Sequence, residues 1–152
     1  MSSRNTKTPD KLREESEHVR YEWEMFAECV RRLMINDYRQ SDLFLHNALI
    51  TDFSVHTRNL LDFFYPTIIH SDDLLAGDYF DNPTDWGNLR PELTPTLVES
   101  RDKVNKQTAH LTEMRVTWSD DKRSWKWVQI YNDLGAVWNL FVAKVAPEKL
   151  CH

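Results

Sequence analysis

Two short stretches of the chain gather side chains suited to acid–base or phosphate chemistry. The first is the string HTRNLLDFFY, which begins at His56, and the second is RDKVNKQTAHLT, which begins at Arg101. A histidine titrates near neutral pH and can act as a general acid or base, and an arginine binds phosphate through several N–H groups. The candidate catalytic residues are Arg58, Arg101, Asn105 and His110.

The same stretches also allow a purely structural interpretation. His56 falls on the apolar face of its predicted helix, and Asp52 and Asn59 lie at the edge of that face. A buried polar network that joins them to Arg101 and Asn105 would fix the register of two helices without any catalysis. The candidate polar cluster comprises Asp52, His56, Asn59, Asp62 and Thr112.

No metal site or cofactor is expected. A di-iron bundle needs two Glu-x-x-His motifs, and the chain has one such string, from Glu15 to His18. The glycine-rich and nucleophile motifs of nucleotide-binding folds, kinases and hydrolases are missing from the sequence. The two cysteines, Cys29 and Cys151, are too few for a disulfide framework, which favours a reducing cytoplasm. A metal-dependent bundle enzyme is a third class, one that would retain a transition metal on purification.

Charge is unevenly distributed along the chain. Residues 41–93 carry two basic and nine acidic side chains, whereas residues 94–152 carry nine basic and seven acidic ones, and the net charge is −5. This balance excludes a broad basic face, so strong nonspecific binding of duplex DNA is not expected. A local cleft for RNA is compatible with it. No apolar run reaches the roughly 18 residues of a membrane span, so no membrane partner is expected.

Four amphipathic segments predict the elements that must position these residues. Thr8 followed by Pro9, and Thr94 followed by Pro95, are typical helix starts. In the third segment Leu97 and Val104 face inward, and Lys103 points away from them. The predicted helices span residues 9–37, 41–65, 95–115 and 120–145.

These segments predict an all-α fold, an antiparallel four-helix bundle with one long crossover between the second and third helices. The single domain covers residues 9–147, with a disordered tail at 1–8 and a frayed tail at 148–152. Short helical turns should interrupt the crossover, since long structureless loops are uncommon in compact domains. The expected anchors of the crossover are Ile68, Ile69, Leu74, Leu75, Phe80 and Trp86.

The pair of strings H-x-R-N-L-L-D-F-F-Y and V-N-K-x-x-A-H-L-T resembles a group of small, mostly uncharacterised bacterial helical proteins, over residues 45–115. It is more distantly similar to the HEPN superfamily. That resemblance implies dimers that cleave RNA without metal, using an arginine and a histidine four to six residues apart. Here Arg58 has no histidine at that spacing, and Asn105 with His110 matches the family's asparagine-to-histidine end. His110 would then act on a ribose hydroxyl, with Arg58 or Arg101 binding phosphate.

A homodimer is expected for two reasons. Phe44, Ala48 and Val55 form a second apolar strip on the 41–65 helix, and Trp125 lies off the apolar arc of the last helix, so the bundle leaves them without a partner. Exposed apolar patches often mark protein interfaces, and symmetric dimers are the commonest closed assemblies. The HEPN resemblance implies a dimer as well. The leading function is therefore a small cytoplasmic helical protein that acts on or near RNA, and the alternative is a non-catalytic protein-interaction module.

Overall fold

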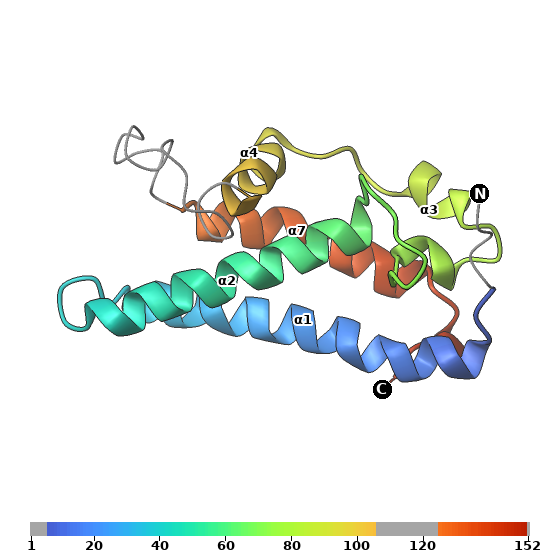
Figure 1. Ribbon diagram of the computed structural model, residues 1–152, viewed down its shortest axis with the longest axis horizontal. Helices are drawn as coiled ribbons and strands as arrows, with labels where there is room; N and C mark the ends of the chain where they lie inside the picture. Colours follow the sequence, from blue (N-terminus) through green and yellow to red (C-terminus); the bar gives the residue numbers. More distant parts are fainter. Residues whose placement is uncertain (1–5, 106–124, 152) are drawn as a thin grey trace.

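The computed structural model describes residues 6–105 and 125–151, and within these ranges every regular element is a helix. This confirms the predicted all-α class. The α-helices of the described part are α1 (Pro9–Ile35), α2 (Leu43–Phe64), α3 (Thr84–Leu89), α4 (Pro95–Lys103) and α7 (Trp127–Lys144), with 3-10 turns η1 (Ala76–Tyr79) and η3 (Pro147–Lys149) (Figure 1).

The helix starts follow the capping signals of the sequence. The Thr8 side chain accepts a hydrogen bond from the Lys11 N–H at 3.3 Å, and Thr94 accepts one from Leu97 at 3.2 Å. At α2 the cap is Asp42, whose side chain accepts a hydrogen bond from the Leu45 N–H at 2.9 Å. The backbone turns sharply before it at Tyr38, whose φ is 60°, and both Ser41 and Asp42 donate their N–H to the Tyr38 carbonyl. The helix therefore starts two residues later than predicted.

Three long helices form the body of the molecule. The helix α1 runs antiparallel to both α2 and α7, and α4 packs on α7 and on α2 (Figure 1). A four-helix bundle with one long crossover is not confirmed, since the described part of the third predicted helix, α4, has nine residues. The third helix was predicted over 95–115. It is α-helical up to Lys103, residues 104 and 105 form a wider helical turn, and the rest of the range lies outside the described residues.

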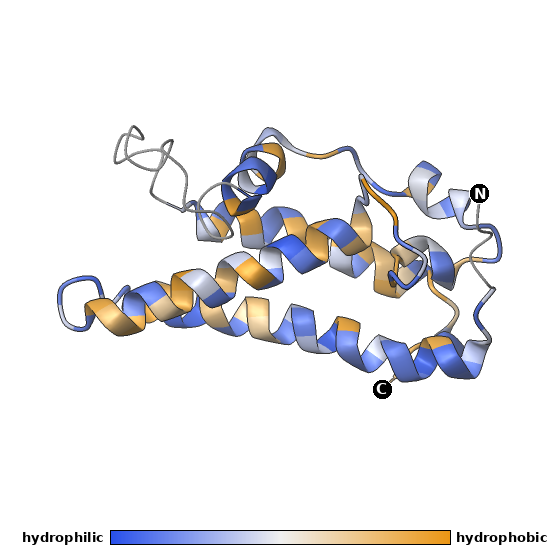
Figure 2. Cartoon of the chain, in the orientation of Figure 1, coloured by the Kyte–Doolittle hydropathy of each residue, from blue (hydrophilic) through white to orange (hydrophobic). Residues whose placement is uncertain are grey.

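Aromatic side chains fill the core between these helices. The Phe26 ring of α1 stacks on Phe53 of α2, with centroids 5.5 Å apart. The Phe141 ring of α7 contacts Phe64 edge-on at 5.7 Å and Tyr79 at 5.3 Å. Hydrophilic residues dominate α1, whereas α2 and α7 carry most of the hydrophobic ones (Figure 2). Because α1 lies at the outside of the molecule, only one of its faces contacts the core. A narrow apolar stripe is enough to cover that face.

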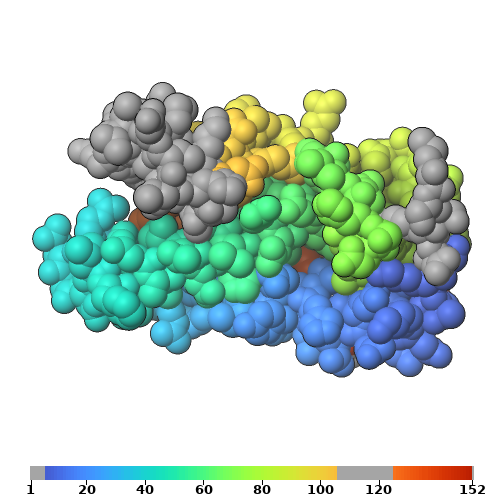
Figure 3. Space-filling model, viewed as in Figure 1, coloured from blue at the N-terminus to red at the C-terminus, as the bar shows by residue number. Residues whose placement is uncertain are grey.

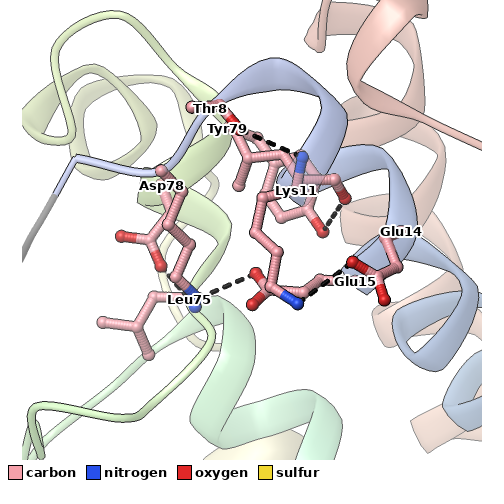
Figure 4. A network of polar contacts seen from close by, with 9 residues as sticks. Thr8, Lys11, Glu14, Glu15, Leu75, Asp78 and Tyr79 are labelled. Carbon is pink, nitrogen blue, oxygen red and sulfur yellow. Dashed lines mark hydrogen bonds and ion pairs between the residues drawn. The ribbon is translucent and has the colours of Figure 1, made fainter.

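The connection between α2 and α4 contains the short helical turns that its length predicts. Of its expected anchors, Trp86 is buried, but Ile68 and Ile69 are exposed, at 74% and 54%. The tightest anchor is Tyr79, whose hydroxyl donates to the Leu12 carbonyl of α1 at 3.1 Å (Figure 4). A Cβ on Gly77 would lie 2.8 Å from the Pro83 carbonyl oxygen, so this fold of the connection requires glycine there.

The described residues of the C-terminal segment 148–152 contact the rest of the chain. The Cys151 N–H donates to the Ser16 hydroxyl of α1 at 2.7 Å, and the Lys149 amine donates to the Tyr79 carbonyl at 2.9 Å. Of the N-terminal tail, residues 6–8 are described, and Lys7 forms an ion pair with Glu15 at 2.8 Å. No described helix is long and apolar enough to cross a membrane.

Two further expectations near α7 are wrong. Residues 125 and 126 are not helical, so α7 starts at Trp127 rather than 120. Trp125 is 6% exposed, because its ring packs edge-on against Phe53 and the Lys103 amine lies 5.0 Å above it. Lys103 is therefore buried too, and burial lowers its pKa. Helical periodicity predicted that Lys103 points outward, because it considers one helix at a time. It does not include the segment before α7, whose Trp125 ring lies against the Lys103 amine.

Candidate functional site

The polar residues of α2 open onto a cleft of about 540 Å³. Its walls come from α2, from the connection that follows α2, and from the end of the α4 segment. In the space-filling view the connection stands out from the surface of α2, close to α1 (Figure 3). The polar lining residues are Arg58, Asn59, Asp62, Thr67, His70, Asp73 and Asn105, and Phe63, Ile68, Leu74 and Leu75 line it as well.

Helical spacing explains the pairing of the charged residues on this wall. Arg58 and Asp62 are four residues apart on α2, and Arg58 Nε lies 3.7 Å from Asp62 Oδ2. About half of each side chain is exposed, so water screens the attraction between them. The Arg58 guanidinium can therefore exchange Asp62 for another anion at little cost.

Behind the cleft, His56 lies between two carboxylates of different helices. Its Nδ1 lies 2.6 Å from Glu22 Oε2 of α1, and its Nε2 lies 3.4 Å from Asp52 Oδ1. Asn59 donates to the same Glu22 oxygen at 3.0 Å. The imidazole is buried, and its contact with Glu22 joins α2 to α1, whereas Asp52 lies on α2 itself, four residues before His56. These contacts tie the two helices together.

Cys29 extends this network on α1. Its thiol donates to Asp52 Oδ2 at 3.2 Å. Burial and the neighbouring carboxylate raise the pKa of the thiol to about 12. The thiol therefore stays protonated at neutral pH and is a poor nucleophile.

A smaller recess of about 130 Å³ adjoins the cleft between α1 and α2. It shares Asn59, Phe63 and Leu74 with the cleft. The other residues of the recess are His18, Val19, Glu22 and Leu60.

Arg101 does not line the cleft. Its guanidinium donates to the carbonyl oxygens of Leu61 at 3.2 Å and Tyr65 at 2.6 Å, at the carboxyl end of α2. Arg90 and the indole of Trp86 donate to the neighbouring Phe64 carbonyl. The Phe64 and Tyr65 carbonyls lie where a helix end leaves acceptors without intrahelical partners, whereas the Leu61 carbonyl also accepts the Tyr65 N–H at 2.8 Å. The contacts of Arg101 therefore hold the carboxyl end of α2, and its expected role in binding phosphate stays a prediction.

The structure brings together only part of the expected cluster. Asp52, His56 and Asn59 do share one network, but their partners on the facing helix come from α1 and not from Arg101 and Asn105, as the sequence suggested. Asp62 lies apart from the network, in the cleft. His110 and Thr112 lie outside the described residues. No group of three or more potential metal ligands occurs among the residues that the structure describes.

Sequence reasoning missed several residues of this site, among them Glu22 and His70. Glu22 follows Val19 by three positions and precedes Phe26 by four, so it lies at the edge of the apolar seam of α1. A carboxylate at that edge indicates a polar partner on the facing helix. The position of His70 could not be predicted. It lies in an irregular connection, and helical periodicity does not predict the course of such a segment.

A comparison of the chain with protein-family models, with curated proteins and with solved structures finds no match. The interpretation of the candidate site therefore depends on its geometry alone.

Proposed function

We propose that the protein is a cytoplasmic, HEPN-like protein that binds a single-stranded RNA segment in the cleft and cleaves it with His110. The observation that carries the proposal is that Arg58 and Asn59 of α2 line the same cleft as Asn105, which follows them by more than forty residues. The cleft volume, about 540 Å³, is within the usual range of small-ligand sites. Both cysteines of the described part are free, in keeping with a reducing compartment.

The cleft offers what an unpaired nucleotide needs. Arg58, half exposed and loosely paired, supplies a cation for one phosphate. The amides of Asn59 and Asn105 present donors and acceptors to base edges or ribose hydroxyls, and Phe63 gives an apolar wall. Asp62 and Asp73 keep the cleft from being a basic groove, which favours a short contact with few phosphates.

The test is binding and cleavage of a fluorescein-labelled single-stranded RNA of mixed sequence in the presence of EDTA. We expect Arg58→Ala to weaken binding several-fold, whereas the matched control Arg20→Ala leaves it unchanged. Arg20 forms a similar pair with Glu24 at 3.5 Å on α1 and lines no described cavity. His110→Ala should abolish cleavage while circular dichroism shows a folded protein. Binding without cleavage would reject catalysis, and no binding would reject the proposal.

A non-catalytic interaction module is the second candidate. His56 contacts α1 and Arg101 contacts the end of α2, and both contacts hold helices together without any catalysis. In addition, large apolar side chains are exposed where α1 ends and α2 begins. They are Met34, Ile35, Leu43 and Phe44, the last at 83% exposure. In this candidate, as in the first, the protein associates as a homodimer.

A further inference from the structure

The recess beside the cleft has the size of one aromatic ring. Its volume of about 130 Å³ is close to that of an engineered cavity of about 150 Å³ that binds benzene. Val19, Leu60, Phe63 and Leu74 give it mostly apolar walls. A planar ring therefore fits the recess better than a charged or bulky group does.

One edge of the recess carries a fixed hydrogen-bond acceptor. Glu22 Oε2 is held by His56 Nδ1 at 2.6 Å and by Asn59 Nδ2 at 3.0 Å. The other oxygen, Oε1, makes no hydrogen bond within the described part of the chain. The Glu22 side chain is 27% exposed, so a ligand can reach it. Two donors on one oxygen fix the direction of the other before any ligand arrives.

We propose that the recess is a nucleobase subsite of the RNA cleft, in which Glu22 selects a single-ring base that carries an amino group, namely cytosine. This inference rests on the proposed RNA function. A carboxylate accepts a hydrogen bond from the N4 amino group of cytosine, whereas uracil presents a carbonyl oxygen at that position, which a carboxylate repels. Because the recess shares Asn59 and Phe63 with the cleft, a base inserted here leaves its phosphate near Arg58.

Two homopolymers of equal length test the subsite. Fluorescence anisotropy at pH 7.5 compares labelled 12-mers of cytidine and of uridine, which have the same number of phosphates and the same ring size. We expect the unmodified protein to bind the cytidine 12-mer about tenfold more tightly. In Glu22→Gln, an amide N–H₂ replaces one carboxylate oxygen, and the affinity for the cytidine 12-mer should fall to that for uridine.

Two more variants separate the subsite from general effects on the fold. Leu74→Trp, in the connection, should fill the recess and remove the cytidine preference without altering the contacts of Glu22. Glu24→Gln is the matched control, since Glu24 is exposed on α1 and pairs only with Arg20 among the described residues. It should keep the preference in full.

The outcomes distinguish the two proposals. Equal affinity of the unmodified protein for both 12-mers, or a cytidine preference that survives Glu22→Gln, overturns the base subsite and leaves RNA binding standing. Binding to neither 12-mer overturns the RNA function and the subsite together.

Discussion

The thiol of Cys29 in α1 donates a hydrogen bond across 3.2 Å to the Asp52 carboxylate in α2. This contact places a buried, neutral sulfur beside a carboxylate that also faces His56. Burial is the larger cause of the raised pKa of the thiol, and Asp52 adds to it. The chemistry of Cys29 therefore reports whether α1 and α2 are packed together.

The first prediction concerns the reactivity of the two cysteines. With a pKa of about 12 instead of 9.0, Cys29 has about a thousandfold less thiolate than an ordinary thiol at pH 8. In the native protein a disulfide reagent such as DTNB should therefore titrate one fast thiol, Cys151, which is partly exposed. Both cysteines should react in guanidinium chloride. Two fast thiols in the native state would contradict the burial of Cys29.

The second prediction is loss of stability at alkaline pH. The pKa values of Cys29 and Tyr79 are both raised by burial, so the folded state holds these protons more tightly than the unfolded chain does. Their contribution is complete below about pH 9 and decreases as the pH rises toward 12. The lowered pKa of Lys103 acts in the opposite direction and moderates the loss.

Urea unfolding at pH 8 to 11 measures this effect. The free energy of unfolding should fall across the series, and Cys29→Ala combined with Tyr79→Phe should flatten the decline. Tyr21→Phe, at an exposed tyrosine of α1, serves as the control and should leave the slope as it is. A profile as steep in the double variant as in the unmodified protein would assign the loss to other groups.

The third prediction separates the structural role of Arg101 from a role in binding. Arg101→Met removes the hydrogen bonds of a charged donor to the Leu61 and Tyr65 carbonyls, and should lower the free energy of unfolding by about 1.5–3 kcal/mol. Arg20→Met, at an exposed position of α1, should change it by less than about 0.5 kcal/mol. Urea unfolding followed by circular dichroism gives both values. Equal values would mean that the cap at the end of α2 is dispensable.

The fourth prediction is a homodimer that depends on the exposed apolar residues of α2. Light scattering at micromolar concentration should report twice the 18.1 kDa chain mass. Phe44→Glu and Val55→Glu should shift the protein toward monomer, because both side chains are exposed. Val142→Glu is a suitable control, since Val142 of α7 is 42% exposed and Val55 is 44%. Trp125 was also expected at this interface, but it is buried within the chain and is therefore not a site for this test. A monomeric unmodified protein would reject the dimer.

Local signals in the sequence predicted the helices well. Thr8 with Pro9 and Thr94 with Pro95 mark helix starts through groups that lie within four residues of each other, so no knowledge of the tertiary structure is needed. The burial of His56 also followed from the periodicity of α2. By contrast, the burial of Tyr79 depends on a contact with Leu12, 67 positions away in sequence, and nothing in the surrounding residues indicates it.

The candidate site was harder to predict, because helical periodicity gives the face of a residue and not the helix opposite it. Arg101 was expected to join a buried network with His56, but its partners are the carbonyls at the end of α2. The sequence assigned the partners of Asp52 and His56 to the third helix, whereas α1 provides them. The error arises because α1 and α4 both offer polar residues to α2, and only packing decides between them.

The hydrogen bond between Ser16 and Cys151 has a consequence for synthesis of the chain. Its two residues are 135 positions apart. At the usual rate of about 5–20 residues per second, a ribosome needs about 7 to 27 s to add the residues between them. During that interval the first turns of α1 lack both η3 and the α7 side chains that complete the core. The nascent chain therefore exposes the apolar surface of α1 until α7 and η3 have been synthesised, and in this interval a chaperone can bind that surface.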